Sequence, residues 1–126
     1  MPALPWTELR PIEPDHDYVA MASRLPLKSY LAVPGFLRKT IKIRRQLAQT
    51  NGLVAYALNA RILVKTFWTF SVWQDRDSLQ QFAATDPHHD IVEQLRPQMS
   101  PTKFDFFTVS GAELPLGWDQ ITARVV

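Results

Sequence analysis

The sequence predicts an α+β fold of the ferredoxin-like class, βαββαβ, in which a four-stranded antiparallel sheet carries two helices on one face. Two observations support this prediction. Apolar residues recur with strand and helix periods in the order strand, helix, strand, strand, helix, strand. Nine of the ten prolines lie at or before Pro34 or at or after Pro97, so regular structure concentrates in the middle of the chain.

The first three elements follow from the apolar pattern. Residues 18–23 form a short apolar run that predicts a strand. The segment 36–50 predicts a helix, because its large apolar residues recur every three or four positions, and Asn51-Gly52 ends it. Residues 53–60 alternate larger and smaller apolar side chains, which predicts the second strand.

The second half repeats the pattern with a broken helix. Residues 66–75 are aromatic and β-branched throughout and predict the third strand. A helix capped at Asp77 or Ser78 follows, and the Asp86-Pro87 pair indicates a second helix start. Residues 104–111 predict the fourth strand.

These elements place a single-domain core at 17–110, between irregular arms at 1–16 and 111–126. The third strand offers Trp68 and Phe70 on one face and Phe67 and Trp73 on the other. A sheet covered on one side would leave the second apolar face open, so we expect a homodimer through the sheet face. We expect the C-terminal arm to lie across a surface of its own subunit or of the partner subunit. Deletion of the arm is then expected to weaken the dimer.

Composition excludes several classes of protein. The 126 residues are 46% apolar and 21% charged, as in globular domains, and no apolar run has the roughly 18 residues of a membrane helix. The first residues lack the pattern of a secretory signal, and there is no cysteine. We therefore expect a cytoplasmic protein without a membrane partner.

The charge is unevenly distributed although its net value is only +2. Between Asp17 and Asp75 there are nine basic residues and no acidic one. This stretch either attracts an anion or is an ordinary solvated surface. Nucleic acid is not expected as a partner, because the third strand lacks the glycines of an RNA-recognition strand.

The stretch FWTFSVWQDRDSLQQFAATDPHH resembles the third-strand to second-helix segment of the dimeric α/β-barrel superfamily. The similarity rests on the aromatic strand with Ser71-x-Trp73, an acidic cap at Asp75 or Asp77, Phe82 in the helix, and a break before His88. The superfamily includes antibiotic-biosynthesis-type monooxygenases, haem-degrading monooxygenases and proteins similar to spheroidene monooxygenase. PGFLRKTIKIRRQLAQTNGLVAYAL resembles the preceding segment of the last group.

The resemblance implies a homodimeric α/β barrel and a monooxygenase-like activity. The branch it most resembles oxidises a small aromatic or polyketide-like substrate without a cofactor, in a pocket between sheet and helices. A non-catalytic dimer that binds a small hydrophobic or aromatic ligand is the alternative. A haem-binding or haem-degrading protein is a further alternative.

His88 is the candidate catalytic residue. If Pro87 opens the helix, His88 shares a face with Ile91, Val92 and Leu95 and looks toward the sheet. A neutral imidazole at a helix start suits a proton acceptor. Otherwise His88 caps the helix or packs beneath it.

Substrate binding is expected from aromatic strand residues and a few polar groups placed among them. Asn59 and Ser71 could orient a carbonyl or hydroxyl group, and Arg44 is the base of the first helix nearest its apolar stripe. The same side chains could instead be core residues or, for Arg44, a surface arginine. The set comprises Tyr56, Trp68, Trp73, Asn59, Ser71, Phe82, His89, Phe106 and Arg44.

No cofactor is expected. Adjacent histidines at His88 and His89 chelate one ion poorly, and the chain has no HxxxH arrangement, so a metal site is not predicted. In the haem-degrading relatives the axial histidine lies about one turn beyond the position of His88, where this chain has Val92. That departure disfavours the haem alternative.

Overall fold

The computed structural model describes residues 3–50, 52–84 and 88–125, with side chains for all of these except 3–5, 47, 48, 62, 83, 84 and 88–91. Five strands form one antiparallel sheet in the order β1-β3-β4-β2-β5. The strands are β1 (Ala3–Glu8), β2 (Asp17–Pro26), β3 (Leu53–Arg61), β4 (Thr66–Trp73) and β5 (Lys103–Ser110).

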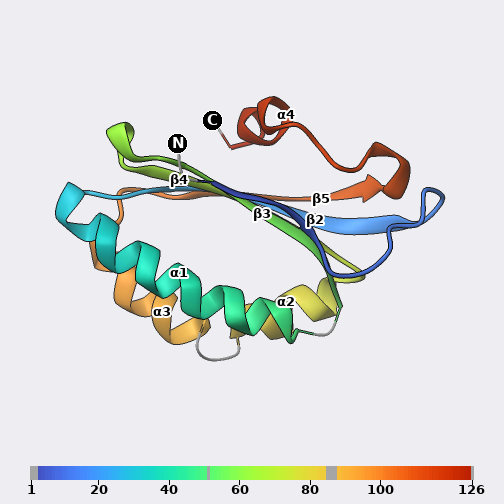
Figure 1. Cartoon of the computed structure of the whole chain (residues 1–126), viewed down its shortest axis with the longest axis horizontal. Coiled ribbons are helices and arrows are strands. Elements are labelled where there is room, and N and C mark those ends of the chain that lie inside the picture. Colours follow the sequence, from blue (N-terminus) through green and yellow to red (C-terminus); the bar gives the residue numbers. More distant parts are fainter. Residues whose placement is uncertain (1–2, 51, 85–87, 126) are drawn as a thin grey trace.

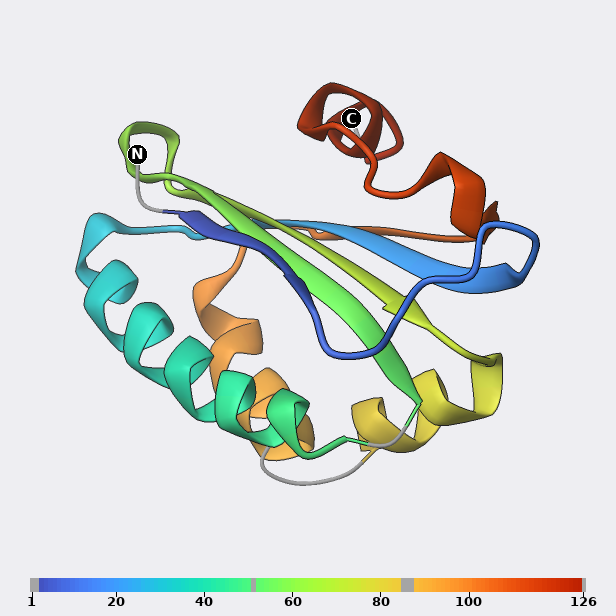
Figure 2. The same cartoon turned by 45° about the vertical axis from the view of Figure 1, so that its right-hand side comes forward.

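The helices lie on both sides of this sheet. Three of them cover one face (Figures 1 and 2): α1 (Val33–Ala48), α2 (Arg76–Ala84) and α3 (His88–Leu95). The short α4 (Trp118–Ala123) lies over the opposite face (Figure 1). In the described part of the chain, none of the helices has the length and apolar character needed to cross a bilayer.

The predicted ferredoxin-like fold is confirmed. The order β2-α1-β3-β4-α2-α3-β5 contains the expected βαββαβ unit, with the second helix divided into α2 and α3. The α1 helix begins at Val33, three residues earlier than expected, because Pro34 is tolerated in a first helical turn. Gly52 turns the chain into β3 with φ of +85°, and a Cβ there would lie 2.1 Å from Ser78 Oγ.

Each arm contains a regular element, so the expectation of wholly irregular arms was wrong. In the N-terminal arm, Ala3–Glu8 forms β1 and adds a fifth strand by pairing with β3. This pairing covers the edge that β3 would otherwise expose. In the C-terminal arm, Ser110 caps a short turn and α4 follows.

The helix-facing side of the sheet is built from alternate residues of β4. Phe67 packs with Phe36 of α1 and Leu95 of α3, and Trp73 packs with Leu79 and Phe82 of α2. Ile43 of α1 contacts both groups. This arrangement fixes which half of the two-sided strand faces the helices.

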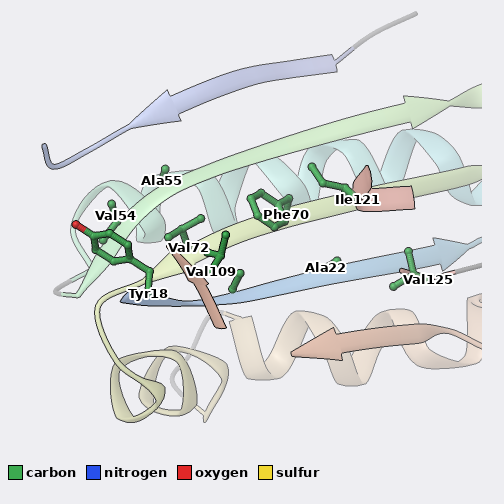
Figure 3. Close-up of a cluster of buried hydrophobic side chains, with 10 residues drawn as sticks. Tyr18, Ala22, Val54, Ala55, Phe70, Val72, Val109, Ile121 and Val125 are labelled. Atoms are coloured by element: carbon green, nitrogen blue, oxygen red, sulfur yellow. The ribbon is translucent and has the colours of Figure 1, made fainter. Parts of the chain in front are cut away.

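The opposite side of the sheet carries its own core (Figure 3). Phe70 and Val72 of β4 lie here with Tyr18 of β2. Ile121 and Val125 from the C-terminal segment pack against them, and each is only 1% exposed. The small side chains of β2 and β3 leave room for this approach: Ala20, Ala22 and Ala55. The sheet face is therefore covered by the chain's own C-terminal segment. The premise of an uncovered face, from which a dimer was expected, was wrong, and the dimer itself stays a prediction.

Candidate functional site

A row of four side chains crosses the helix-facing side of the sheet. Tyr56 of β3 lies opposite Ser71 of β4, Ser71 opposite Met21 of β2, and Met21 opposite Phe106 of β5. Tyr56 is 6% exposed and Phe106 is 46% exposed. The row therefore runs from a closed end under the helices to an open end at the sheet edge.

A second row lies beside the first. It joins Leu58, Thr69, Ser23 and Phe104 across the same four strands. The hydroxyls of Ser23 and Thr69 hydrogen-bond each other, and Ser23 is buried. Phe104 is 53% exposed, so this row also opens toward β5.

The closed end is held rigid by Trp73. Its indole Nε1 donates a hydrogen bond of 2.8 Å to Ser71 Oγ, and both residues are buried. The Trp73 ring packs against Phe82 with centroids 5.3 Å apart. Because the indole is the donor and Ser71 Oγ the acceptor in this hydrogen bond, the Ser71 hydroxyl can still donate its own proton to another group.

Tyr56 supplies the free polar group of this end. Within the described residues its hydroxyl makes no hydrogen bond, although the ring packs with Leu53, Trp73 and Phe82. The two rows thus place hydroxyl groups among aromatic and apolar side chains, with no charged side chain in either row. Such a surface suits an aromatic molecule with carbonyl or hydroxyl substituents.

The structure brings together part of the predicted set. Tyr56, Ser71, Trp73 and Phe82 meet at the closed end, and Phe106 lies on the same face at the sheet edge. Sequence reasoning missed Met21, Ser23, Thr69 and Phe104. Strand alternation in β2 and β5 was the available signal, but it needed the pairing register to become specific.

Other predicted residues lie elsewhere. Trp68 and Asn59 are cross-strand partners on the face that α4 covers, so they do not join the site between sheet and helices. The reason is strand alternation, since each is one residue away from a helix-facing position. Arg44 is exposed on α1 and is not turned into the apolar stripe.

The histidine candidates stay predictions. The backbone of α3 begins at His88, but the side chains of His88 and His89 lie outside the described residues. Leu95, seven residues after His88, is buried in the helix-facing core, whereas Val92 is 37% exposed. No group of three His, Cys, Asp or Glu residues is placed to hold a metal ion within the described residues.

Comparison with known proteins identifies the fold through solved structures. No protein-family model matches the chain, and no curated protein matches it. A candidate monooxygenase from Fusobacterium nucleatum superposes with a TM-score of 0.67 over 79% of this chain at 16% identity. The chain spans only 45% of the length of that protein.

Two shorter proteins match over most of their own length. SnoaB from Streptomyces nogalater, a cofactor-independent oxygenase, has a TM-score of 0.57 and 20% identity, over 74% of this chain and 93% of its own. A candidate antibiotic biosynthesis monooxygenase from Nitrosomonas europaea has a TM-score of 0.66 and 15% identity, over 82% and 96%. The chain therefore has the fold of antibiotic-biosynthesis-type monooxygenases, as the sequence resemblance implied.

Proposed function

We propose that this protein is a monooxygenase that oxidises a small aromatic, polyketide-like substrate with dioxygen and without a bound cofactor. The observation that carries the proposal is the pair of rows on the helix-facing side of the sheet. They combine a closed aromatic end at Tyr56 and Trp73 with an open end at Phe104 and Phe106. The likeness in fold to a cofactor-independent oxygenase supports the same activity.

The reaction needs an electron-rich substrate that itself reduces dioxygen. A base removes a proton from an activated CH2 group, the resulting carbanion transfers electrons to dioxygen, and a C–O bond forms in a hydroperoxide. Loss of water then breaks the O–O bond and leaves a carbonyl group. Overall, CH2 and O2 become C=O and H2O.

The chain's own groups have separate roles in this scheme. His88 is the proposed proton acceptor. The hydroxyls of Tyr56 and Ser71 orient and stabilise the substrate oxygen that becomes negatively charged when the proton leaves. The aromatic side chains packed around them limit the access of water, which strengthens those hydrogen bonds.

Oxygen uptake with dithranol, an anthrone with one activated CH2 group, tests the proposal. We expect protein-dependent uptake of one O2 for each anthraquinone formed, above the rate with heat-denatured protein. Tyr56→Phe removes only the phenolic hydroxyl, so we expect a loss of about tenfold in kcat/KM, the scale of one hydrogen bond.

A matched control separates site effects from general ones. Arg38→Gln changes an exposed residue of α1 and is expected to leave the rate unchanged. Absence of protein-dependent uptake with dithranol and with a naphthoquinol would contradict an oxygenase. Stoichiometric binding of dithranol without uptake would instead support the ligand-binding alternative.

A further inference from the structure

A hollow lies on the face of the sheet that α4 covers. It has a volume of about 350 Å³ and is lined by Arg24, Trp68, Asp119, Thr122, Ala123 and Val125. This volume falls within the range of small-molecule sites, about 300–1,000 Å³. Trp68 alternates with the helix-facing residues Phe67 and Thr69 of β4, so the sheet separates this hollow from the site described above.

The floor of the hollow, on the sheet side, is formed by the Trp68 indole and the Arg24 guanidinium group, and Arg61 lies beside Trp68 outside this lining. Trp68 of β4 has Arg24 of β2 as its cross-strand partner, and the Arg61 guanidinium carbon lies 5.6 Å from the Trp68 ring centroid. In the described part of the chain neither arginine forms an ion pair. Arg124, by contrast, is paired with Asp105 at 3.1 Å. The floor therefore offers a positive charge that forms no ion pair within the described residues.

The roof offers the opposite chemistry. Asp119 of α4 contributes an exposed carboxylate that forms no ion pair within the described residues. The Thr122 hydroxyl already donates to the Trp118 carbonyl oxygen at 2.8 Å, so what it can offer a ligand is an acceptor. A guest that fits is flat, carries an acid group toward the floor and presents a hydrogen-bond donor toward the roof.

We propose that this hollow binds a small aromatic carboxylate with a hydroxyl or amino substituent. Its ring stacks on Trp68, its acid group points toward Arg24 and its substituent points toward Asp119. The acid group pairs with Arg24, as guanidinium groups readily do with carboxylates. The ring lies on the indole, and the substituent donates to Asp119. Because the guest touches both the sheet and α4, its binding stabilises the docked C-terminal segment.

The test is to titrate 4-hydroxybenzoate into the whole protein. Binding is measured by calorimetry and by the NMR signals of the indole N–H groups of the four tryptophans. We expect saturable binding, with the Trp68 signal shifting more than that of Trp73. Benzoate lacks the donor and methyl 4-hydroxybenzoate lacks the acid, so both are expected to bind at least about tenfold more weakly.

Three variants assign the contacts. Arg24→Gln and Trp68→Leu are expected to weaken 4-hydroxybenzoate binding at least about tenfold. Asp119→Asn is expected to weaken 4-hydroxybenzoate but not benzoate. Arg38→Gln removes the same charge as Arg24→Gln, but from an exposed residue on the other side of the sheet. This variant should bind 4-hydroxybenzoate with wild-type affinity.

Several results would overturn the proposal. They are no binding at millimolar concentration, wild-type affinity in Arg24→Gln, or an indole shift confined to Trp73. The outcome is independent of the proposed oxygenase, because the two sites lie on opposite faces. Loss of 4-hydroxybenzoate binding in Arg24→Gln with unchanged dithranol oxidation would support this second site alone.

Discussion

At the scale of single residues, the Trp73–Ser71 hydrogen bond determines how firmly the closed end of the site is held. Ser71→Ala removes the acceptor and leaves the buried indole N–H unpaired. We expect the free energy of unfolding to fall by about 1–3 kcal/mol. Denaturant unfolding measures this, with Thr108→Ala on exposed β5 as the control. Equal stability of Ser71→Ala and the wild type would mean that the hydrogen bond contributes nothing to the fold.

The role of His88 belongs to the same scale. Leu95 is buried and lies seven residues, or two helical turns, after His88, so we expect His88 to share its inward face. His88→Ala should lower kcat for dithranol by about 10²- to 10⁴-fold, the contribution of a general base, with little change in melting temperature. His89→Ala is the matched control and should retain activity. Equal losses in both variants would contradict this orientation.

At the scale of elements, the start of α2 depends on one carboxylate. Asp75 accepts a hydrogen bond of 2.7 Å from the Ser78 backbone N–H, and this contact, with the Ser78 hydroxyl, lowers the pKa of Asp75 below its ordinary value of 3.8. A lowered folded-state pKa stabilises the fold above the unfolded value, and the effect is lost as pH falls through the folded value. Asp75→Ala should therefore lower the melting temperature at pH 7, and the difference from the wild type should shrink as pH falls below 3.8 and the carboxylate is protonated.

Asp75→Asn is the control for this prediction. Asparagine keeps a cap acceptor without titrating, so its melting temperature at pH 7 should stay near that of the wild type. A gap between Asp75→Ala and the wild type that persists unchanged into acid would contradict a role for the ionised carboxylate.

Several elements could be predicted from the sequence, and the exceptions have physical causes. The β4 strand was predictable because aromatic and β-branched residues fill it, but both of its faces are apolar, so the helix-facing set needed the pairing register. The β1 strand was missed because Pro5 argues against a strand, yet β1 is an edge strand, where proline is tolerated. The α4 helix has six residues, too few for periodicity to indicate it.

The same limits apply to the candidate site. Ser71 and Trp73 were predictable because they alternate within one strongly marked strand. Trp68 and Asn59 were included in the candidate set because the sequence did not show which face of each strand meets the helices, and neighbouring strand residues lie on opposite faces. Ser23 and Thr69 meet only through β2–β4 pairing between residues 46 positions apart, which local patterns do not report.

At the scale of the whole molecule, the C-terminal segment occupies the face that a second copy would need. Burial of Ile121 and Val125 together contributes roughly 3–6 kcal/mol. Truncation after Ser110 should therefore lower the melting temperature and expose the apolar surface around Phe70 and Val72 (Figure 3). We therefore predict the opposite of the effect expected from the sequence: deletion should strengthen self-association through the sheet, because it removes a competitor for this face.

Sedimentation velocity at micromolar concentration measures this effect on the full chain and on the truncated one. Ile121→Asp in the full chain is a second variant, which loosens the segment while leaving every residue present. We expect both altered proteins to show a larger dimer fraction than the wild type, with circular dichroism reporting that the sheet is retained. A stable dimer of the full chain that dissociates on truncation would contradict the competition and would place the C-terminal segment in the interface itself.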